Sequence, residues 1–182
     1  TDQTDLFDVQ IKRLHAYKRL LLQVMHIVDR SLTLKENPKS DFAKRISIFG
    51  AKAAPRDHYA KSVIKFINEL DNLVNNDPAI GDKIKIVFVE NYGVSLAELI
   101  IPAANLSEQI SLAGKEASGT SNMKLMANGA LTMATLDGAN VEIYDLVGDD
   151  NIFLFGMTAD DVQKLREANN YYSRGIYEEN PQ

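Results

Sequence analysis

Ile84-Lys85-Ile86-Val87-Phe88-Val89 is the stretch that decides the fold, because β-branched and aromatic residues fill it. The turn formers Asn75-Asn76-Asp77-Pro78 separate it from the segment before it. This composition predicts a central strand. Comparable runs at 46–49, 131–135 and 152–155 predict three further strands of the same sheet.

The segments between these strands have the character of helices. Apolar residues at three- and four-residue steps, end signals and turn formers predict helices over 7–34, 55–74, 95–101, 122–128 and 159–169. Strands that alternate with helices predict an α/β fold, a partial Rossmann-like domain with a mostly parallel sheet and ligands at the strand carboxyl ends. Because the chain is expected to open on a helix and has no G-x-G-x-x-G motif, the first strand and phosphate turn of a complete doubly wound domain are expected to be missing.

Composition sets the class of protein. The 182 residues are 45% hydrophobic and 25% charged, which suits one globular domain or a large piece of one. Without cysteine there is no disulfide, no thiolate metal site and no cysteine nucleophile. No apolar run approaches the roughly 20 residues of a membrane span, and the N-terminus lacks the layout of a signal peptide. We therefore expect a soluble, cytoplasmic protein that does not bind a membrane.

Charge is unevenly distributed along the chain. Residues 1–66 hold 13 Lys and Arg against 7 Asp and Glu, although the net charge of the chain is -5. A basic first third favours an anionic ligand. Its basic residues are not interleaved with aromatic ones, so nucleic acid is not an expected partner.

Two groups of residues are candidates for chemistry. Ser118-Gly119-Thr120-Ser121 precedes a predicted helix and has the composition of a phosphate cradle, and an ordinary helix cap is the alternative. Lys124 follows one turn later, where its amine suits a Schiff base with an aldehyde cofactor; a solvated surface lysine is the alternative.

The second group is Lys12, Arg13 and Lys18, which could converge on phosphate. On the predicted helix Lys12 and Arg13 point to different sides, and Lys18 lies about 140° around from Arg13. A shared site therefore requires long side chains or a broken first turn, and solvated helix residues are the alternative. The histidines lack partners at ligand spacing, so we expect no metal site.

Several blocks resemble one known family. Glu116-Ala117-Ser118-Gly119-Thr120-Ser121-Asn122-Met123-Lys124 closely resembles the cofactor segment of the α-glucan phosphorylases that act on glycogen, starch and maltodextrin. The resemblance extends in register to Phe7–His15, Tyr17–Arg19, Gly50–Pro55, Ile101–Ala104, Asn128–Leu131 and Leu136–Glu142. It covers roughly residues 6–170, and several blocks in register are far more specific than one.

The resemblance implies a pyridoxal 5'-phosphate site. Lys124 matches the lysine that binds this cofactor as a Schiff base, and Thr120 and Ser121 match positions whose amides hold its phosphate. Lys12 matches a basic contact to that phosphate, and Tyr92 an aromatic residue beside the cofactor. The family commonly has glycine at the position of Ser121.

The resemblance also implies a substrate site. Arg13 and Lys18 match residues that bind the substrate phosphate, which makes them, with Lys124, the expected catalytic residues. Glu116, Ser118 and Gly119 match groups that hydrogen-bond hydroxyls of the glucosyl unit. The implied reaction is cleavage of terminal α-1,4-glucosyl links by inorganic phosphate to give glucose 1-phosphate.

In the implied architecture residues 1–182 are an incomplete C-terminal, cofactor-binding domain, like the C-terminal half of a two-domain (GT-B type) glycosyltransferase. The N-terminal domain is then absent, the whole protein is expected to be a homodimer, and these residues alone are expected to be inactive. Two alternatives stay open on the residues themselves. One is a retaining nucleotide-sugar glycosyltransferase domain, and the other is a non-catalytic module that binds a sugar phosphate.

Overall fold

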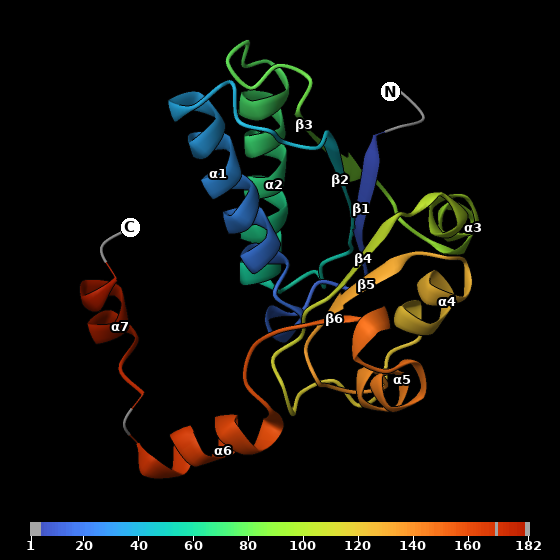
Figure 1. Cartoon of the computed structure of the whole chain (residues 1–182), viewed down its shortest axis with the longest axis vertical. Coiled ribbons are helices and arrows are strands. Elements are labelled where there is room, and N and C mark those ends of the chain that lie inside the picture. The colour runs from blue at the N-terminus through green and yellow to red at the C-terminus, as the bar shows by residue number, and fades with distance from the viewer. Residues whose placement is uncertain (1–4, 170, 181–182) are drawn as a thin grey trace.

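A single parallel sheet organises the chain, and the computed structural model describes residues 5–169 and 171–180 (Figure 1). Its strands are β1 (Leu6–Ile11), β2 (Arg45–Gly50), β3 (Ile84–Val89), β4 (Leu106–Gln109), β5 (Leu131–Ala134) and β6 (Phe153–Leu154). All paired strands are parallel, in the order β3-β2-β1-β4-β5-β6. This is the strand order of a Rossmann-like sheet, so the predicted α/β fold is confirmed.

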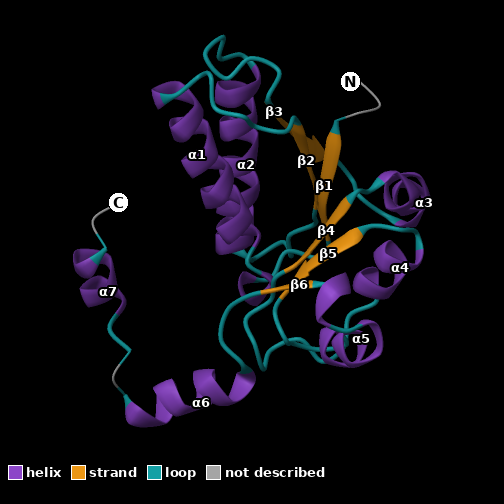
Figure 2. Ribbon diagram, in the orientation of Figure 1, coloured by secondary structure: helices purple, strands orange, loops and turns teal. Residues whose placement is uncertain are grey.

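Helices cover the two faces of this sheet in different places (Figure 2). The helices are α1 (Leu20–Glu36), α2 (His58–Asn75), α3 (Val94–Ala103), α4 (Ser121–Ala127), α5 (Asn140–Val147), α6 (Ala159–Ala168) and α7 (Ser173–Glu179). α1 and α2 lie on one face, and α3, α4 and α5 lie on the other. α6 and α7 extend away from the sheet. The arrangement is doubly wound, as right-handed crossovers between parallel strands require.

Two apolar clusters of the described core pack helices against opposite faces of the sheet, and a third surrounds Ile143 of α5. Leu34, Ile67 and Phe49 represent the cluster between α1, α2 and the sheet, and each is almost fully buried. Val9 of β1 and Leu125 of α4 belong to the cluster on the opposite face, and both are completely buried. Each fully buried side chain of this size contributes roughly 1.5–3 kcal/mol, so packing fixes the helices that carry the loops.

The opening of the chain contradicts the prediction of a helix over 7–34. Residues 6–11 form β1, a 3-10 turn spans Ala16–Lys18, and α1 begins only at Leu20. Phe7, Val9 and Ile11 alternate with Asp8 and Gln10, and this period of two fits a strand. The expectation that the first strand is missing was therefore wrong as well. The strand was not predicted because Asp8 and Gln10 are buried although they are polar, whereas a strand buried on both faces is normally apolar throughout.

The remaining predicted elements agree with the structure within a few residues. β2, β3, β5 and β6 correspond to the predicted strands, although β6 is shorter. Pro102 was predicted to follow its helix but lies inside the last turn of α3. Thr158 caps α6, since its side chain accepts a hydrogen bond from the Asp161 amide. The elements β4, α5 and α7 were not predicted.

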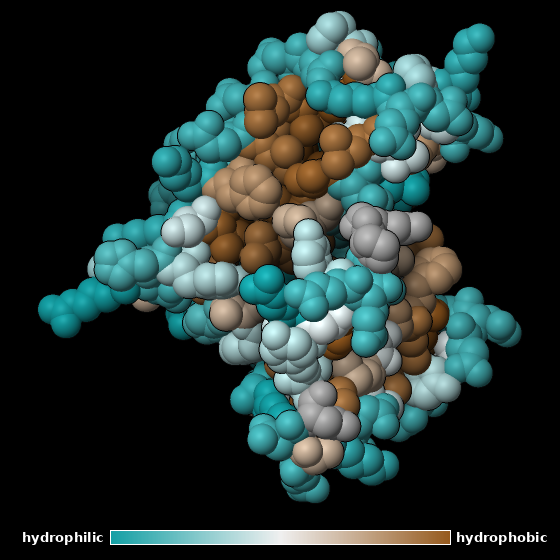
Figure 3. Space-filling model, turned by 90° about the vertical axis from the view of Figure 1, so that its left-hand side faces the viewer, coloured by the Kyte–Doolittle hydropathy of each residue, from teal (hydrophilic) through white to brown (hydrophobic). Residues whose placement is uncertain are grey.

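One side of the molecule is strongly apolar (Figure 3). α1 and α2 cover β1 to β3, whereas Leu131 of β5 and Phe153 of β6, on the same face by register, each remain 54% exposed. Leu22, Met25 and Leu32 of α1 are exposed too. The apolar area therefore combines the outer surface of α1 with the uncovered part of the sheet.

Candidate functional site

The candidate site lies where the strand order of the sheet reverses. β1 is central, with β2 on one side and β4 on the other. The loop after β1 carries Lys12 and Arg13, and the loop after β4 runs from Ile110 to Thr120. Both loops leave the carboxyl ends of adjacent parallel strands, which is the place where doubly wound sheets bind ligands.

Two adjoining cavities occupy this place. A cavity of about 820 Å³ is lined by Lys12, Arg13, Tyr92, Thr120, Ser121 and Lys124, together with the apolar side of α3. A second cavity of about 490 Å³ is lined by Lys18, Glu116, Ser118 and Gly119, and it shares five of those residues with the first: Lys12, Arg13, Tyr92, Thr120 and Ser121. Every residue of the predicted site therefore lines one or both cavities. Lys124 is confined to the first cavity and the predicted sugar-binding residues to the second.

Lys12 stands at the boundary between the cavities. Its ammonium group donates hydrogen bonds to the Glu108 carbonyl at 2.7 Å and to Gln109 Oε1 at 3.2 Å. Burial, and then the positive charge of Lys18, lower the pKa of Lys12 to about 7, although Glu108 and Glu116 oppose the shift. An anion placed beside this lysine would restore its charge, because an opposite charge stabilises the protonated form.

On a single helix Arg13 and Lys18 would point about 140° apart. In the structure neither residue lies on α1, so this obstacle to a shared site is absent. Arg13 is in the loop after β1, and Lys18 ends the 3-10 turn. Arg19, with a left-handed φ of 55°, then turns the chain into α1, and its Nε donates to the Ile110 carbonyl at 2.7 Å. The broken first turn lets both cations line the second cavity.

Lys18 forms an ion pair with Glu116 across the second cavity. Both side chains are less than one-fifth exposed, so water screens the pair weakly. A residue predicted to hold substrate phosphate is therefore joined to one predicted to hold the sugar. The two loops are coupled through this contact.

α4 carries Lys124 into the first cavity. Leu125 and Asn122 of the same helix are buried, while Lys124 is exposed and its amide donates to the Thr120 carbonyl. The buried neighbours fix the helix, and the lysine stem projects from its open side. Lys124 therefore has the free amine that a covalent link to an aldehyde requires.

Tyr92 closes the first cavity near β2. A Cβ at Gly50 would come within 3.0 Å of the Tyr92 ring, so this glycine lets the ring seat against the strand. Burial raises the pKa of the Tyr92 hydroxyl, which keeps it protonated and able to donate a hydrogen bond.

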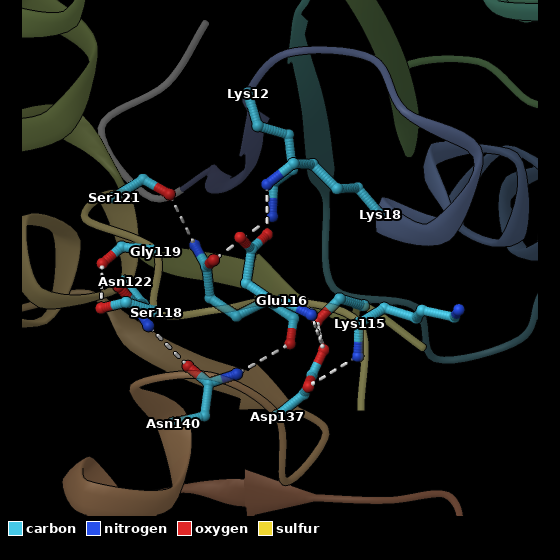
Figure 4. A network of polar contacts seen from close by, with 12 residues as sticks. Lys12, Lys18, Lys115, Glu116, Ser118, Gly119, Ser121, Asn122, Asp137 and Asn140 are labelled. Atoms are coloured by element: carbon cyan, nitrogen blue, oxygen red, sulfur yellow. Dashed lines mark hydrogen bonds and ion pairs between the residues drawn. The ribbon is translucent and has the colours of Figure 1, made fainter. Parts of the chain in front are cut away.

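The prediction from sequence gave no role to Asp137 or Asn140, yet both organise the site (Figure 4). The Asp137 carboxylate accepts from the amides of Gly114 and Glu116, each at 2.9 Å. Asn140 donates to the Gln109 carbonyl and accepts from Asn122 on α4. Their signal in the sequence is the Asp-Gly-Ala-Asn run directly after β5, where a strand ends at the ligand edge.

Over residues 5–169 and 171–180, no group of three or more His, Asp or Glu side chains is arranged to hold a metal ion. Among the described residues, no helix has the length and hydrophobicity of a membrane span.

Comparisons with known proteins agree with this geometry. The profile of the family described as carbohydrate phosphorylase matches residues 1–182. The liver form of glycogen phosphorylase from Homo sapiens is 52% identical over 179 residues, covering 98% of this chain and 21% of that protein. Glycogen phosphorylase from Pasteurella multocida is 56% identical over 165 residues, covering 91% of this chain and 20% of that protein.

A third relative, glycogen phosphorylase from Haemophilus influenzae, is 53% identical over 181 residues, covering 100% of this chain and 22% of that protein. The chain thus spans about a fifth of the length of the curated relatives it matches. Since the family profile matches the chain from end to end, the chain belongs to the carbohydrate phosphorylase family.

Proposed function

We propose that this chain is the cofactor-side wall of the active site of an α-glucan phosphorylase. The whole protein would transfer terminal α-1,4-glucosyl units of a glucan to inorganic phosphate, giving glucose 1-phosphate. The observation that carries the proposal is that Lys12 and Arg13 line both the Lys124 cavity and the Glu116 cavity, with Lys18 beside them in the second cavity. That arrangement suits two phosphate groups and one sugar in adjoining spaces.

The first cavity fits pyridoxal 5'-phosphate. Its size falls in the range of small-molecule sites, and it combines exposed lysine amines, those of Lys124 and Lys52, with an aromatic ring and an apolar wall. Lys124 would hold the aldehyde carbon, and Tyr92 with α3 would cover the ring. Lys12 would meet the phosphate, and the depressed pKa of this lysine fits a site that gains an anion. When bound, the cofactor would supply a phosphate group that can exchange a proton with the substrate phosphate.

The second cavity fits a glucosyl unit and inorganic phosphate. The reaction breaks the bond between C1 of the terminal unit and O4 of the next, joins C1 to a phosphate oxygen, and gives a proton to O4. Arg13 and Lys18 would bind the substrate phosphate and stabilise the negative charge around it. Glu116 and the loop at Ser118 and Gly119 would orient the sugar through its hydroxyls.

In the whole protein a second domain would face these cavities. We propose that the 182 residues belong to the C-terminal domain and that an N-terminal domain contributes the opposite wall, in a homodimeric enzyme. Both cavities are open, which leaves room for that wall. The 182-residue chain by itself is expected to be inactive.

The test is phosphorolysis by the full-length protein. Incubation with maltoheptaose and phosphate should release glucose 1-phosphate, and Arg13→Ala should abolish release while the cofactor stays bound. Arg56→Ala, at an exposed arginine outside both cavities, is the matched control and should retain activity. A wild-type protein that releases no glucose 1-phosphate but transfers glucose from a nucleotide sugar would replace this proposal with the glycosyltransferase alternative. Sugar phosphate binding without any turnover would favour the non-catalytic module.

A further inference from the structure

We propose that Asp137 is a positioning residue, which fixes the sugar-binding loop so that Glu116 and Ser118 meet the glucosyl hydroxyls at set positions. The proposal rests on the function proposed above and adds a residue to that site. Asp137 lies in the turn between β5 and α5 and lines the second cavity. It acts through the loop before α4 and not on the reacting atoms.

The contacts of Asp137 fix the first part of the loop between β4 and α4. Its carboxylate is buried and accepts from the Ser111 hydroxyl at 2.6 Å, from the amides of Gly114 and Glu116 at 2.9 Å each, and from the Lys115 amide at 3.2 Å (Figure 4). Three successive amides thus converge on one carboxylate. Hydrogen bonds to an ionised acceptor are the stronger kind, so this contact fixes the backbone that carries Glu116.

The residues after Asp137 fix the other end of the loop. The Ala139 amide donates to the Ser118 carbonyl at 2.7 Å. Gly138 approaches so closely that a Cβ there would lie 2.5 Å from the same carbonyl oxygen. The turn after β5 is therefore hydrogen-bonded to the loop at both Glu116 and Ser118. These contacts tie this part of the loop to the sheet.

The ion pair of Glu116 extends this control to the phosphate side. Glu116 meets Lys18, and Arg19 donates to the carbonyls of Ile110 and Ser111 at the start of the same loop. Burial lowers the pKa of Arg19, and the negative charge of Asp137 opposes this shift. The loop that Asp137 fixes is thus joined to the loop after β1 through Lys18 and Arg19. A displacement of about 1 Å at such a position can reduce a rate by about 100-fold.

A double-mutant cycle in the full-length protein tests the proposal. Asp137→Asn puts a donor against the row of amides, and it should lower kcat/KM for maltoheptaose by about 10- to 100-fold with pyridoxal phosphate content unchanged. Because Asp137 acts through Glu116, adding Asp137→Asn to Glu116→Gln should lower kcat/KM little further. The exposed Asp150→Asn is the matched control and should match wild type.

Hydrogen exchange supplies a readout that does not depend on activity. In the 182-residue chain, Asp137→Asn should speed exchange at the amides of Gly114, Lys115 and Glu116, and Asp150→Asn should not. Ser111→Ala, which removes one contact, should do so more weakly and serves if Asp137→Asn does not fold. Unchanged exchange, or fold-changes in kcat/KM that multiply in the double variant, would overturn the proposal. A wild-type protein without phosphorolysis would instead contradict the proposed function, and the exchange result would still decide whether Asp137 fixes the loop.

Discussion

Asp8 of β1 and Glu108 of β4 place their carboxyl groups beside one another on the same face of the sheet, close to the strand ends that carry the site. Both residues are at most 3% exposed. Burial is the main cause that raises both pKa values, and the negative charge of Asp8 adds to the shift of Glu108. Arg45 and Gln23 partly offset the shift of Asp8. The pair therefore retains a proton at pH values where exposed carboxyls are ionised.

The first prediction is that this carboxyl pair makes the free energy of unfolding fall as the pH rises from about 5 to about 7, below the range in which Lys12 loses its proton. In the unfolded chain these carboxyls titrate near pH 4. The folded state holds their protons more tightly, so it is the state that loses stability when the protons leave. Urea unfolding of the 182-residue chain at several pH values measures the slope.

Glu108→Gln should flatten that slope, because an amide keeps the hydrogen-bonding shape of the protonated acid without titrating. Glu69→Gln, at an exposed position of α2, is the matched control and should keep the wild-type slope. A Glu108→Gln protein with the same slope as wild type would show that the buried pair does not govern this pH dependence.

The second prediction concerns the charge of Lys12. Since burial and Lys18 lower the pKa of Lys12 to about 7, sulfate should bind the 182-residue chain more weakly as the pH rises through 7. Sulfate does not titrate in this range, so any change comes from the protein. Loss of one positive charge at a partly screened site should reduce affinity by about fivefold, which corresponds to about 1 kcal/mol.

Lys12→Arg should bind sulfate with a weaker dependence on pH, because the guanidinium stays charged. Deprotonation of Glu108 also weakens anion binding as the pH rises, so Glu108→Gln measures that share separately. Isothermal titration at pH 6 and pH 8.5 gives both comparisons. An unchanged pH dependence in Lys12→Arg would contradict the assignment to this lysine.

The third prediction separates backbone strain from a clash at Gly138. Gly138 and Gly129 both have positive φ, at 57° and 90°, but a Cβ at Gly129 would meet nothing within 4 Å. Gly129→Ala should therefore lower the free energy of unfolding only by the backbone strain, about 1 kcal/mol. Gly138→Ala adds to its backbone strain a methyl group that is driven into the Ser118 carbonyl, so it should lose distinctly more. Equal losses in urea unfolding would show that the loop yields at Ser118.

The sequence predicts the fold well wherever apolar residues dominate. β3 follows from Ile84–Val89 with its observed bounds, and α4 from the pattern before Gly129. β1 and β4 could not be found in this way, because buried polar side chains interrupt both strands. Strands buried on both faces normally read as continuous apolar runs.

These polar strands carry the site, and that is why local rules fail there. Gln109 of β4 is buried where its side chain accepts from Lys12, and Glu108 is buried where its carboxyl group meets Asp8, needs that no short window of sequence reveals. The residues assigned to the site by resemblance to the phosphorylases each line one or both cavities. The positions of Asp137 and Asn140 beneath the loop depend on contacts across more than 20 residues, which the structure alone supplies.

The last prediction concerns the lysine of the first cavity. In the full-length protein, borohydride treatment followed by peptide mapping should find a pyridoxyl group on Lys124. The motivation is the exposed amine of this lysine on a helix whose neighbours, Asn122 and Leu125, are buried. Lys124→Ala should abolish both the adduct and phosphorolysis, and it should leave the free energy of unfolding within about 0.5 kcal/mol, as for other surface substitutions.

Two further variants make this test selective. Lys115→Ala removes a nearby lysine that lines neither cavity, and it should keep the adduct and most of the activity. Arg13→Ala should keep the adduct and lose turnover, because its charge is assigned to the substrate phosphate and not to the cofactor. Loss of the adduct in Arg13→Ala would show that Arg13 also binds the cofactor, and would contradict its assignment to the substrate phosphate alone. A pyridoxyl group on another lysine, or on none, would show that the first cavity does not hold the cofactor through Lys124.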